Sequence, residues 1–341
     1  MKTTFITAAA IASALALTAG AVSAQSAKEF YKGKSVEIYI GYGLGGTYGK
    51  SATIMGEHLR PRIGADSVIV KSMPGAGGLK MTNYYANVAK KDGTAIMLPP
   101  DTLAITQMLK PKKAKYDVRN FTWLGASVRS NSLSAVRADS NVKSWTDLKS
   151  KGVPFACSGL GSQTCQIPAL INGLLGTKIK IVRGYKGSKK MLLAMEQGEA
   201  AGINLTWLAF KTNRQEWFQK GFAIPIIQMG PTKDPELQDV PNLKDLVSAK
   251  DRPIVNFMSS LIAIGRSLAV HKNTPADRTA FLKSAFVDMA KDPIFIADMK
   301  KRKLQVTYTS ADDIHKIVNE SVSMSSDVIN RTNKILFGGA S

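Results

Sequence analysis

One stretch near the N-terminus limits the folds open to this chain more than any other. Residues 36–40 alternate like a strand, and a glycine-dense turn follows from Gly41 to Gly46. Beyond the turn, apolar side chains recur with helical spacing from Tyr48 to Leu59. A strand, a glycine-rich turn and a helix start leave backbone N–H groups and the positive end of the helix dipole within the turn. The stretch therefore predicts an anion-binding turn.

A dinucleotide site is the first alternative for this turn. Gly41, Gly43 and Gly46 satisfy the pattern G-x-G-x-x-G between a strand and a helix. That pattern also needs an acidic residue at the end of the next strand, to hold the ribose hydroxyls. The next expected strand, residues 67–71, ends without one, and Asp66 precedes it. The sequence therefore does not favour a nicotinamide cofactor, and we expect no cofactor.

Residues 1–24 have the composition of a secretory signal peptide. Lys2 is their single charge, an apolar run extends from Phe5 to Ala19, and the small-x-small sequence of residues 22–24 predicts cleavage after Ala24. A membrane anchor is the alternative, but a span needs about 20 strongly apolar residues. We therefore expect an exported, periplasmic protein, which also lies out of reach of nicotinamide cofactors.

The net charge favours anionic partners. The chain carries +21, and loss of Lys2 with the signal peptide leaves +20. Such a surplus attracts anionic solutes, nucleic acid or acidic membranes. The basic residues are dispersed, and the densest run, residues 110–115, is typical of a solvated loop. We expect a general attraction for anionic solutes and no nucleic-acid partner.

Two cysteines, Cys157 and Cys165, lie eight positions apart. In an oxidising compartment they favour a disulfide that closes a short loop, and two buried thiols are the alternative.

The order of elements predicts two α/β units. Parallel strands alternating with helices bind ligands at the carboxyl ends of the strands. The loops at 43–48, 74–78 and 99–102 should therefore lie on one rim, and the glycine-rich turn at 158–162 should start a second unit. Two buried strands, 224–228 and 261–264, are predicted to return to the first unit. We expect a signal peptide (1–24), a first lobe in two parts (25–128 and 227–341) and a second lobe (129–226).

The sequence offers little for catalysis. His58, His271 and His315 lack metal-ligand spacing, and no nucleophile elbow or phosphate-binding loop motif is found. Ser162 next to Thr164 resembles a nucleophile site only if a base comes from a distant segment. We expect a binding protein without metal; an exported hydrolase and a ligand-presenting protein for a signalling partner are the alternatives.

The chain resembles the Bug-type periplasmic solute receptors of tripartite tricarboxylate transporters over nearly its whole mature length. The spacing of two motifs, Met-Pro-Gly-Ala-Gly-Gly and Lys-Asp-Gly-Thr, is the most specific part of the resemblance. The matching segments are Phe30–Lys34, Gly41–Tyr42 with Gly45, Gly46 and Tyr48, Met73–Gly78, Asn83–Tyr84, Lys91–Thr94, Tyr185–Gly187 and Thr274–Ala276.

The resemblance implies a type II periplasmic-binding-protein fold, with two Rossmann-like lobes that close on a small organic carboxylate. It also implies a membrane permease as partner, and nothing in the chain demands more than a monomer. In such receptors the first glycine-rich loop holds a ligand carboxylate through backbone groups and waters. The implied site residues are Gly45, Gly46, Thr47, Tyr48, Ser162, Gln163 and Thr164, with supporting contacts from Ala76, Gly77, Asp101, Thr102, Tyr185 and Asn204.

Two segments depart from the family. Gly49 stands where the family commonly has an acidic residue, which leaves the first loop less negative and its helix less well capped. Gln163 and the cysteine pair stand where members often have Thr and His. From the implied site we predict that Thr47→Ala or Ser162→Ala weakens binding about tenfold and leaves the fold intact.

Overall fold

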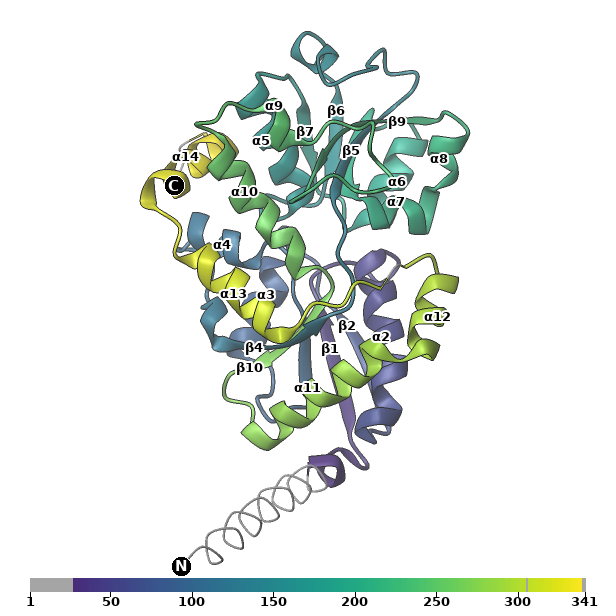
Figure 1. The fold of residues 1–341 in the computed structure, drawn as a ribbon, viewed down its shortest axis with the longest axis vertical. Helices are drawn as coiled ribbons and strands as arrows, with labels where there is room; N and C mark the ends of the chain where they lie inside the picture. The colour runs from purple at the N-terminus through teal and green to yellow at the C-terminus, as the bar shows by residue number, and fades with distance from the viewer. Residues whose placement is uncertain (1–26, 305, 339–341) are drawn as a thin grey trace, which may run out of the picture.

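A computed structural model describes residues 27–304 and 306–338; the expected signal peptide and its cleavage site lie outside them. Two lobes, each built on a five-stranded sheet, lie one above the other (Figure 1). The expected two-lobed α/β architecture is confirmed. None of the helices within the described ranges combines the length and apolar character needed to span a membrane.

The first sheet has the order β2-β1-β3-β10-β4. β1 runs parallel to β2 and β3, and β10 runs antiparallel to β3 and β4. The chain therefore leaves this sheet after β4 and returns through β10, which lies between β3 and β4. The strands are β1 (Ser35–Ile40), β2 (Ser67–Ser72), β3 (Ala95–Leu98), β4 (Phe121–Ala126) and β10 (Ser267–His271).

Helices cover both faces of the first sheet. Ile38 and Ile40 of β1 pack with Met55 and Leu59 of α2 and with Phe286 of α11 in one buried cluster. The helical spacing after Tyr48 predicted this buried face of α2. α2 (Thr47–Ile63), α11 (Ala276–Lys291) and α12 (Pro293–Lys301) lie on this side, and α3 (Leu79–Asn87), α4 (Leu103–Leu109) and α13 (Ala311–Val322) on the other.

The second sheet has the order β7-β6-β8-β5-β9. β6 lies parallel to β7 and β8, whereas β5 is antiparallel to β8 and β9. Its strands are β5 (Ser132–Arg137), β6 (Pro154–Cys157), β7 (Lys180–Arg183), β8 (Gly202–Thr206) and β9 (Ala223–Met229). α5 (Gln163–Leu175) packs on one face, and α6 (Ser188–Glu196) and α7 (Trp207–Arg214) pack on the other. Three short helices, α8 (Glu216–Gln219), α9 (Leu243–Leu246) and α10 (Arg252–Ser260), follow around this lobe.

The C-terminal third differs from the prediction. β9 pairs with β5 in the second sheet, so the expected return at residue 227 falls inside this strand. Residues 261–264, predicted as a strand, form a 3-10 helix, and the returning strand β10 begins only at Ser267. The last helix, α14 (Ser326–Phe337), packs against α5 of the second lobe. The periodicity of short apolar runs does not separate a strand from a helical turn, which explains the error at 261–264.

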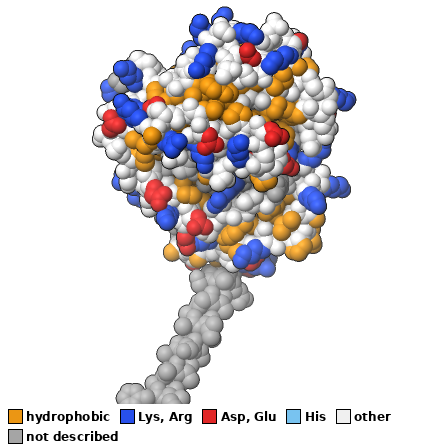
Figure 2. All heavy atoms as spheres, turned by 45° about the horizontal axis from the view of Figure 1, so that its top comes forward, with side chains coloured by type: hydrophobic (Ala, Val, Ile, Leu, Met, Phe, Trp, Pro, Cys, Tyr) orange, Lys and Arg blue, Asp and Glu red, His pale blue; other side chains and the backbone are white. Residues whose placement is uncertain are grey.

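Basic side chains are spread over the viewed face as separate groups, with acidic side chains between them (Figure 2).

Candidate functional site

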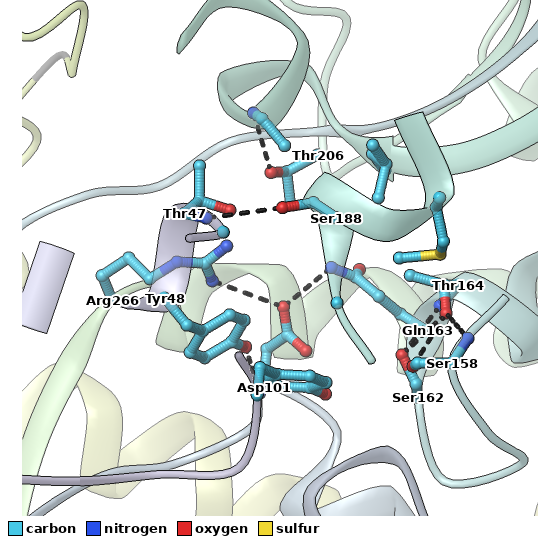
Figure 3. A pocket seen from close by; sticks show the side chains of 16 residues that line it. Thr47, Tyr48, Asp101, Ser158, Ser162, Gln163, Thr164, Ser188, Thr206 and Arg266 are labelled. Atoms are coloured by element: carbon cyan, nitrogen blue, oxygen red, sulfur yellow. Dashed lines mark hydrogen bonds and ion pairs between the residues drawn. The ribbon is translucent and has the colours of Figure 1, made fainter. Parts of the chain in front are cut away.

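A small cavity lies between the lobes, at the carboxyl ends of the parallel strands. It holds about 40 Å³ of free space, enough for a few water molecules. Sixteen residues line it, from segments of both lobes (Figure 3): Tyr42, Gly46, Thr47, Tyr48, Asp101, Ser158, Ser162, Gln163, Thr164, Gly187, Ser188, Met191, Leu205, Thr206, Ala209 and Arg266.

Four helices begin at this cavity. The starts of α2, α5, α6 and α7 each contribute lining residues. The unpaired N–H groups and dipole of each helix start favour negative charge. The arrangement is therefore suited to a small anion held between the two lobes.

The start of α2 has no side-chain cap of its own. Its N-cap is Gly46, and the N–H of Thr47 donates to Ser188 Oγ of the other lobe at 3.4 Å. Both Thr47 and Tyr48 are buried. The first glycine-rich turn thus presents a bare helix start, as its sequence predicted.

Gly49 has a structural reason to be glycine. A Cβ at this position would lie 1.9 Å from the carbonyl oxygen of Leu44, well inside any allowed contact. The turn folds back onto the first turn of α2, which leaves no room for a side chain. An acid of the kind the family commonly has here cannot fit this loop.

The second glycine-rich turn is held by its own side chains. Ser162 caps α5 by accepting from the N–H of Thr164 at 3.2 Å. The Thr164 hydroxyl in turn accepts from the N–H of Ser158 at 3.1 Å. A disulfide joins Cys157 to Cys165 at the two ends of this turn, which settles the choice between a bridge and two thiols.

Two buried charges face each other at the first-lobe side of the cavity. Arg266 Nη1 lies 3.7 Å from Asp101 Oδ2, and the guanidinium lies 3.8 Å from the centre of the Tyr48 ring. Asp101 Oδ2 also accepts from Gln163 Nε2 at 2.8 Å (Figure 3). Burial raises the pKa of the Asp101 carboxyl above its ordinary value, because the Arg266 guanidinium opposes the shift only in part.

The structure brings seven of the predicted residues to the cavity: Gly46, Thr47, Tyr48, Asp101, Ser162, Gln163 and Thr164. Six others lie elsewhere. Gly45 packs near Lys189, Tyr185 is half exposed and its hydroxyl contacts Glu199, and Asn204 bonds to Ser132 and Ser134 inside the sheet. The last three, Ala76, Gly77 and Thr102, form contacts between the lobes.

These interlobe contacts hold the cleft closed. Thr102 Oγ1 donates to the Gly161 carbonyl at 2.5 Å, and the N–H of Gly43 donates to the Lys186 carbonyl at 3.2 Å. Gly77 has a φ of +71°, and a Cβ there would lie 2.4 Å from the nitrogen of Ser162. Its glycine therefore allows the two loops to touch.

Sequence reasoning missed Arg266 and the hydroxyls of Ser188 and Thr206. The Ser188 hydroxyl accepts from the Thr47 N–H across the cleft, a contact that joins two distant segments of the chain. Arg266 directly precedes β10, whereas the sequence predicted the returning strand at 261–264, so the start of that strand was not placed at the cavity. Its burial, at 3 % exposure, is the signal that marks it, and only the tertiary structure reveals that.

A basic cluster surrounds one edge of the cleft. Burial first, and then the neighbouring cations Arg214, Lys189 and Lys303, lower the pKa of Lys50. Lys50 Nζ donates to Asn213 Oδ1 of the other lobe at 2.8 Å. This positive rim raises the local concentration of anions near the cavity.

The hydroxyls of the cavity lining have no histidine beside them. The Ser162 hydroxyl contacts the Thr164 hydroxyl at 2.9 Å, and none of the sixteen lining residues is a histidine. Within residues 27–304 and 306–338, no three His, Cys, Asp or Glu side chains gather as a metal site would require.

The fold has solved relatives. No protein-family model and no curated protein sequence matches the chain. The periplasmic binding protein BugD is 19 % identical, with a TM-score of 0.68 over 84 % of this chain and 94 % of BugD. MatC from Rhodopseudomonas palustris, solved with bound malate, is 19 % identical, with a TM-score of 0.69 over 86 % and 98 %. An R. palustris protein solved with adipate is 18 % identical, with a TM-score of 0.69 over 87 % and 97 %. The chain therefore has the periplasmic-binding-protein fold.

Proposed function

We propose that this chain is an exported solute-binding protein that closes its two lobes over a small organic carboxylate. Four helix starts converge on one buried cavity, and two of these helices directly follow the glycine-rich turns. This observation carries the proposal. Helix starts from both lobes contribute, so the complete anion site exists only when the cleft is closed. The site residues of the proposal are the lining residues of that cavity.

The comparisons support the ligand class. Two proteins with the same fold carry adipate and malate, both small carboxylates. We infer membership of the Bug-type receptor family, a periplasmic location after cleavage behind Ala24, and delivery of the ligand to a permease of a tripartite tricarboxylate-type transporter. In this function the protein is a monomer and carries out no catalysis.

A thermal-shift screen of the mature protein against mono-, di- and tricarboxylates tests this function. A ligand at a hundred times its dissociation constant should stabilise the fold by ~2.7 kcal/mol. Chloride and phosphate at equal ionic strength serve as controls for unspecific anion effects. Absence of a shift with every acid, or turnover of ester or amide substrates, would overturn the proposal.

A further inference from the structure

The cavity contains a buried guanidinium with unused donors. The Arg266 side chain is 4 % exposed, and its Nε has no hydrogen-bond partner. Its Nη1 approaches Asp101 Oδ2 only to 3.7 Å, which is longer than a hydrogen bond. An arginine has five N–H donors, and leaving a buried charged donor unpaired is costly. The side chain is therefore organised for a partner that enters the cavity.

The Tyr48 ring and a backbone hydrogen bond hold Arg266 in place. It lies 3.8 Å from the centre of the Tyr48 ring, and the backbone N–H of Arg266 donates to the Val128 carbonyl at 2.9 Å. Figure 3 shows the side chain extending along Tyr48 toward the cavity, with Thr47 and Asp101 on either side. A planar guanidinium held in this way matches the two oxygens of a carboxylate.

Asp101 provides an acceptor beside this donor. Its side chain is 6 % exposed, Oδ2 accepts from Gln163, and Oδ1 has no partner. Asp101 and Arg266 are the two formally charged members of the lining, so the lining is neutral as a whole. Arg266 can then pair with a bound carboxylate, while a ligand donor placed against Asp101 satisfies its unpaired oxygen.

One part of the second-lobe wall is unsuited to a second carboxylate. Met191, Leu205 and Ala209 form an apolar part of the second-lobe wall. A second charged group against these three side chains would be buried without a cation or a polar partner beside it.

Resting on the proposed carboxylate binding, we propose that the site selects small monocarboxylates that carry a hydroxyl or ammonium group on the carbon next to the carboxylate. The carboxylate receives paired N–H bonds from Arg266, and the neighbouring group donates to Asp101. The two protein groups lie side by side, as the two ligand groups do on adjacent carbons.

Calorimetric titration of the mature protein with four acids tests the selection. Propionate and lactate differ by one hydroxyl, as do succinate and malate, and lactate and malate differ by one carboxylate. We expect lactate to bind at least tenfold tighter than propionate, because propionate leaves Asp101 without its donor, and malate to bind no tighter than lactate. Alanine, in which an ammonium replaces the hydroxyl, should also bind tighter than propionate.

Three variants assign the roles. Arg266→Met should lower the affinity for every acid at least a hundredfold, and Arg266→Lys, which keeps the charge and the fold but loses the paired donors, at least tenfold. Asp101→Asn should reduce the preference for lactate over propionate to less than threefold. Arg119→Met and Asp139→Asn, at exposed surface positions, are matched controls without effect.

The outcomes separate the two proposals. Binding of acids with equal affinity for lactate and propionate, or with unchanged affinity in Arg266→Lys, overturns the inference and leaves the proposed function standing. Tighter binding of malate than of lactate overturns it as well. If none of the acids binds, the proposed function fails and this inference fails with it.

Discussion

The two walls of the cavity are built differently. The first-lobe wall holds both charges, Asp101 and Arg266, and a helix start capped only by Gly46. The second-lobe wall is neutral, and Ser162 and Thr206 cap their own helices. The second wall also has the disulfide at the ends of its turn.

The difference shows which wall depends on the closed state. Most polar groups of the second-lobe turn find partners within that turn. In the first wall, Thr47 N–H and the Asp101 carboxylate both use side chains of the other lobe, Ser188 and Gln163. Opening of the cleft therefore leaves polar groups of the first wall without these partners. We infer that the first wall carries selectivity and that the second wall is the preorganised part of the clamp.

The largest expected effect comes from filling the first turn. Gly49→Ala places a methyl group 1.9 Å from the Leu44 carbonyl oxygen. Helix propensity alone favours alanine over glycine by about 1 kcal/mol. We expect the collision to outweigh this gain in helix propensity, so that Gly49→Ala lowers the free energy of unfolding by about 3 kcal/mol. Urea denaturation of the ligand-free protein measures the change.

Gly176→Ala is the control for this experiment. Gly176 has a φ of +67°, but a Cβ at this position would have no atom within 4 Å, so alanine there adds backbone strain without a collision. It should cost about 1 kcal/mol. An equal or smaller cost for Gly49→Ala would show that the first turn accommodates a side chain and that glycine is not required there.

The second prediction concerns the disulfide of the second wall. Replacing both Cys157 and Cys165 with alanine removes a cross-link over a short loop, which should lower the free energy of unfolding by ~2.5 kcal/mol. Lactate or malate affinity should fall less than threefold, because the Ser162 and Thr164 hydrogen bonds of the turn remain. Chemical denaturation and calorimetry measure the two quantities. An unchanged stability would mean that the second wall is not held by its bridge.

The third prediction compares one hydroxyl from each wall. Ser162→Ala removes a helix cap and should cost about 1 kcal/mol of stability as well as about tenfold in affinity. Thr47→Ala removes no cap and should lower affinity about tenfold at unchanged stability. Both variants should therefore lose affinity, as the sequence predicts, and only Ser162→Ala should also lose stability, because it removes the cap of α5. Equal losses of stability in the two variants would contradict the difference between the walls.

Local patterns were enough to predict the architecture. The strand, turn and helix around Gly41–Gly46 form where periodicity places them, because strand alternation, glycine and helical spacing act within a few residues. The same holds for the second turn at Ser158–Ser162. The prediction of two α/β lobes follows from these local signals and is confirmed.

The errors come from side-chain direction and long-range packing. Leu205 lines the cavity and its neighbour Asn204 does not, because successive side chains of β8 point to opposite faces. Arg266 carries no local signal, since its burial depends on Tyr48 and Asp101, more than a hundred positions away. A prediction from sequence needs the exact register of a strand to place such residues, and register is set by tertiary pairing.

The smallest expected effect is a pH dependence that belongs to the first wall alone. Burial raises the pKa of Asp101 in the folded protein above its ordinary value of 3.8. The folded state then binds this proton more tightly than the unfolded state does, so the contribution of Asp101 to stability is fully present below pH 3.8 and is lost as the pH rises through the folded pKa.

The variant Asp101→Asn has no titratable group at this position. The stability of the wild type relative to this variant should therefore be greater at pH 4 than at pH 7, by urea denaturation at both values, while other carboxylates cancel in the difference. A relative stability that rises with pH would show that the effect of Arg266 on the Asp101 pKa is larger than the effect of burial. Asp101 and Arg266 would then form a stabilising ion pair in the ligand-free protein, and the Asp101 carboxylate would not be left to pair with a ligand.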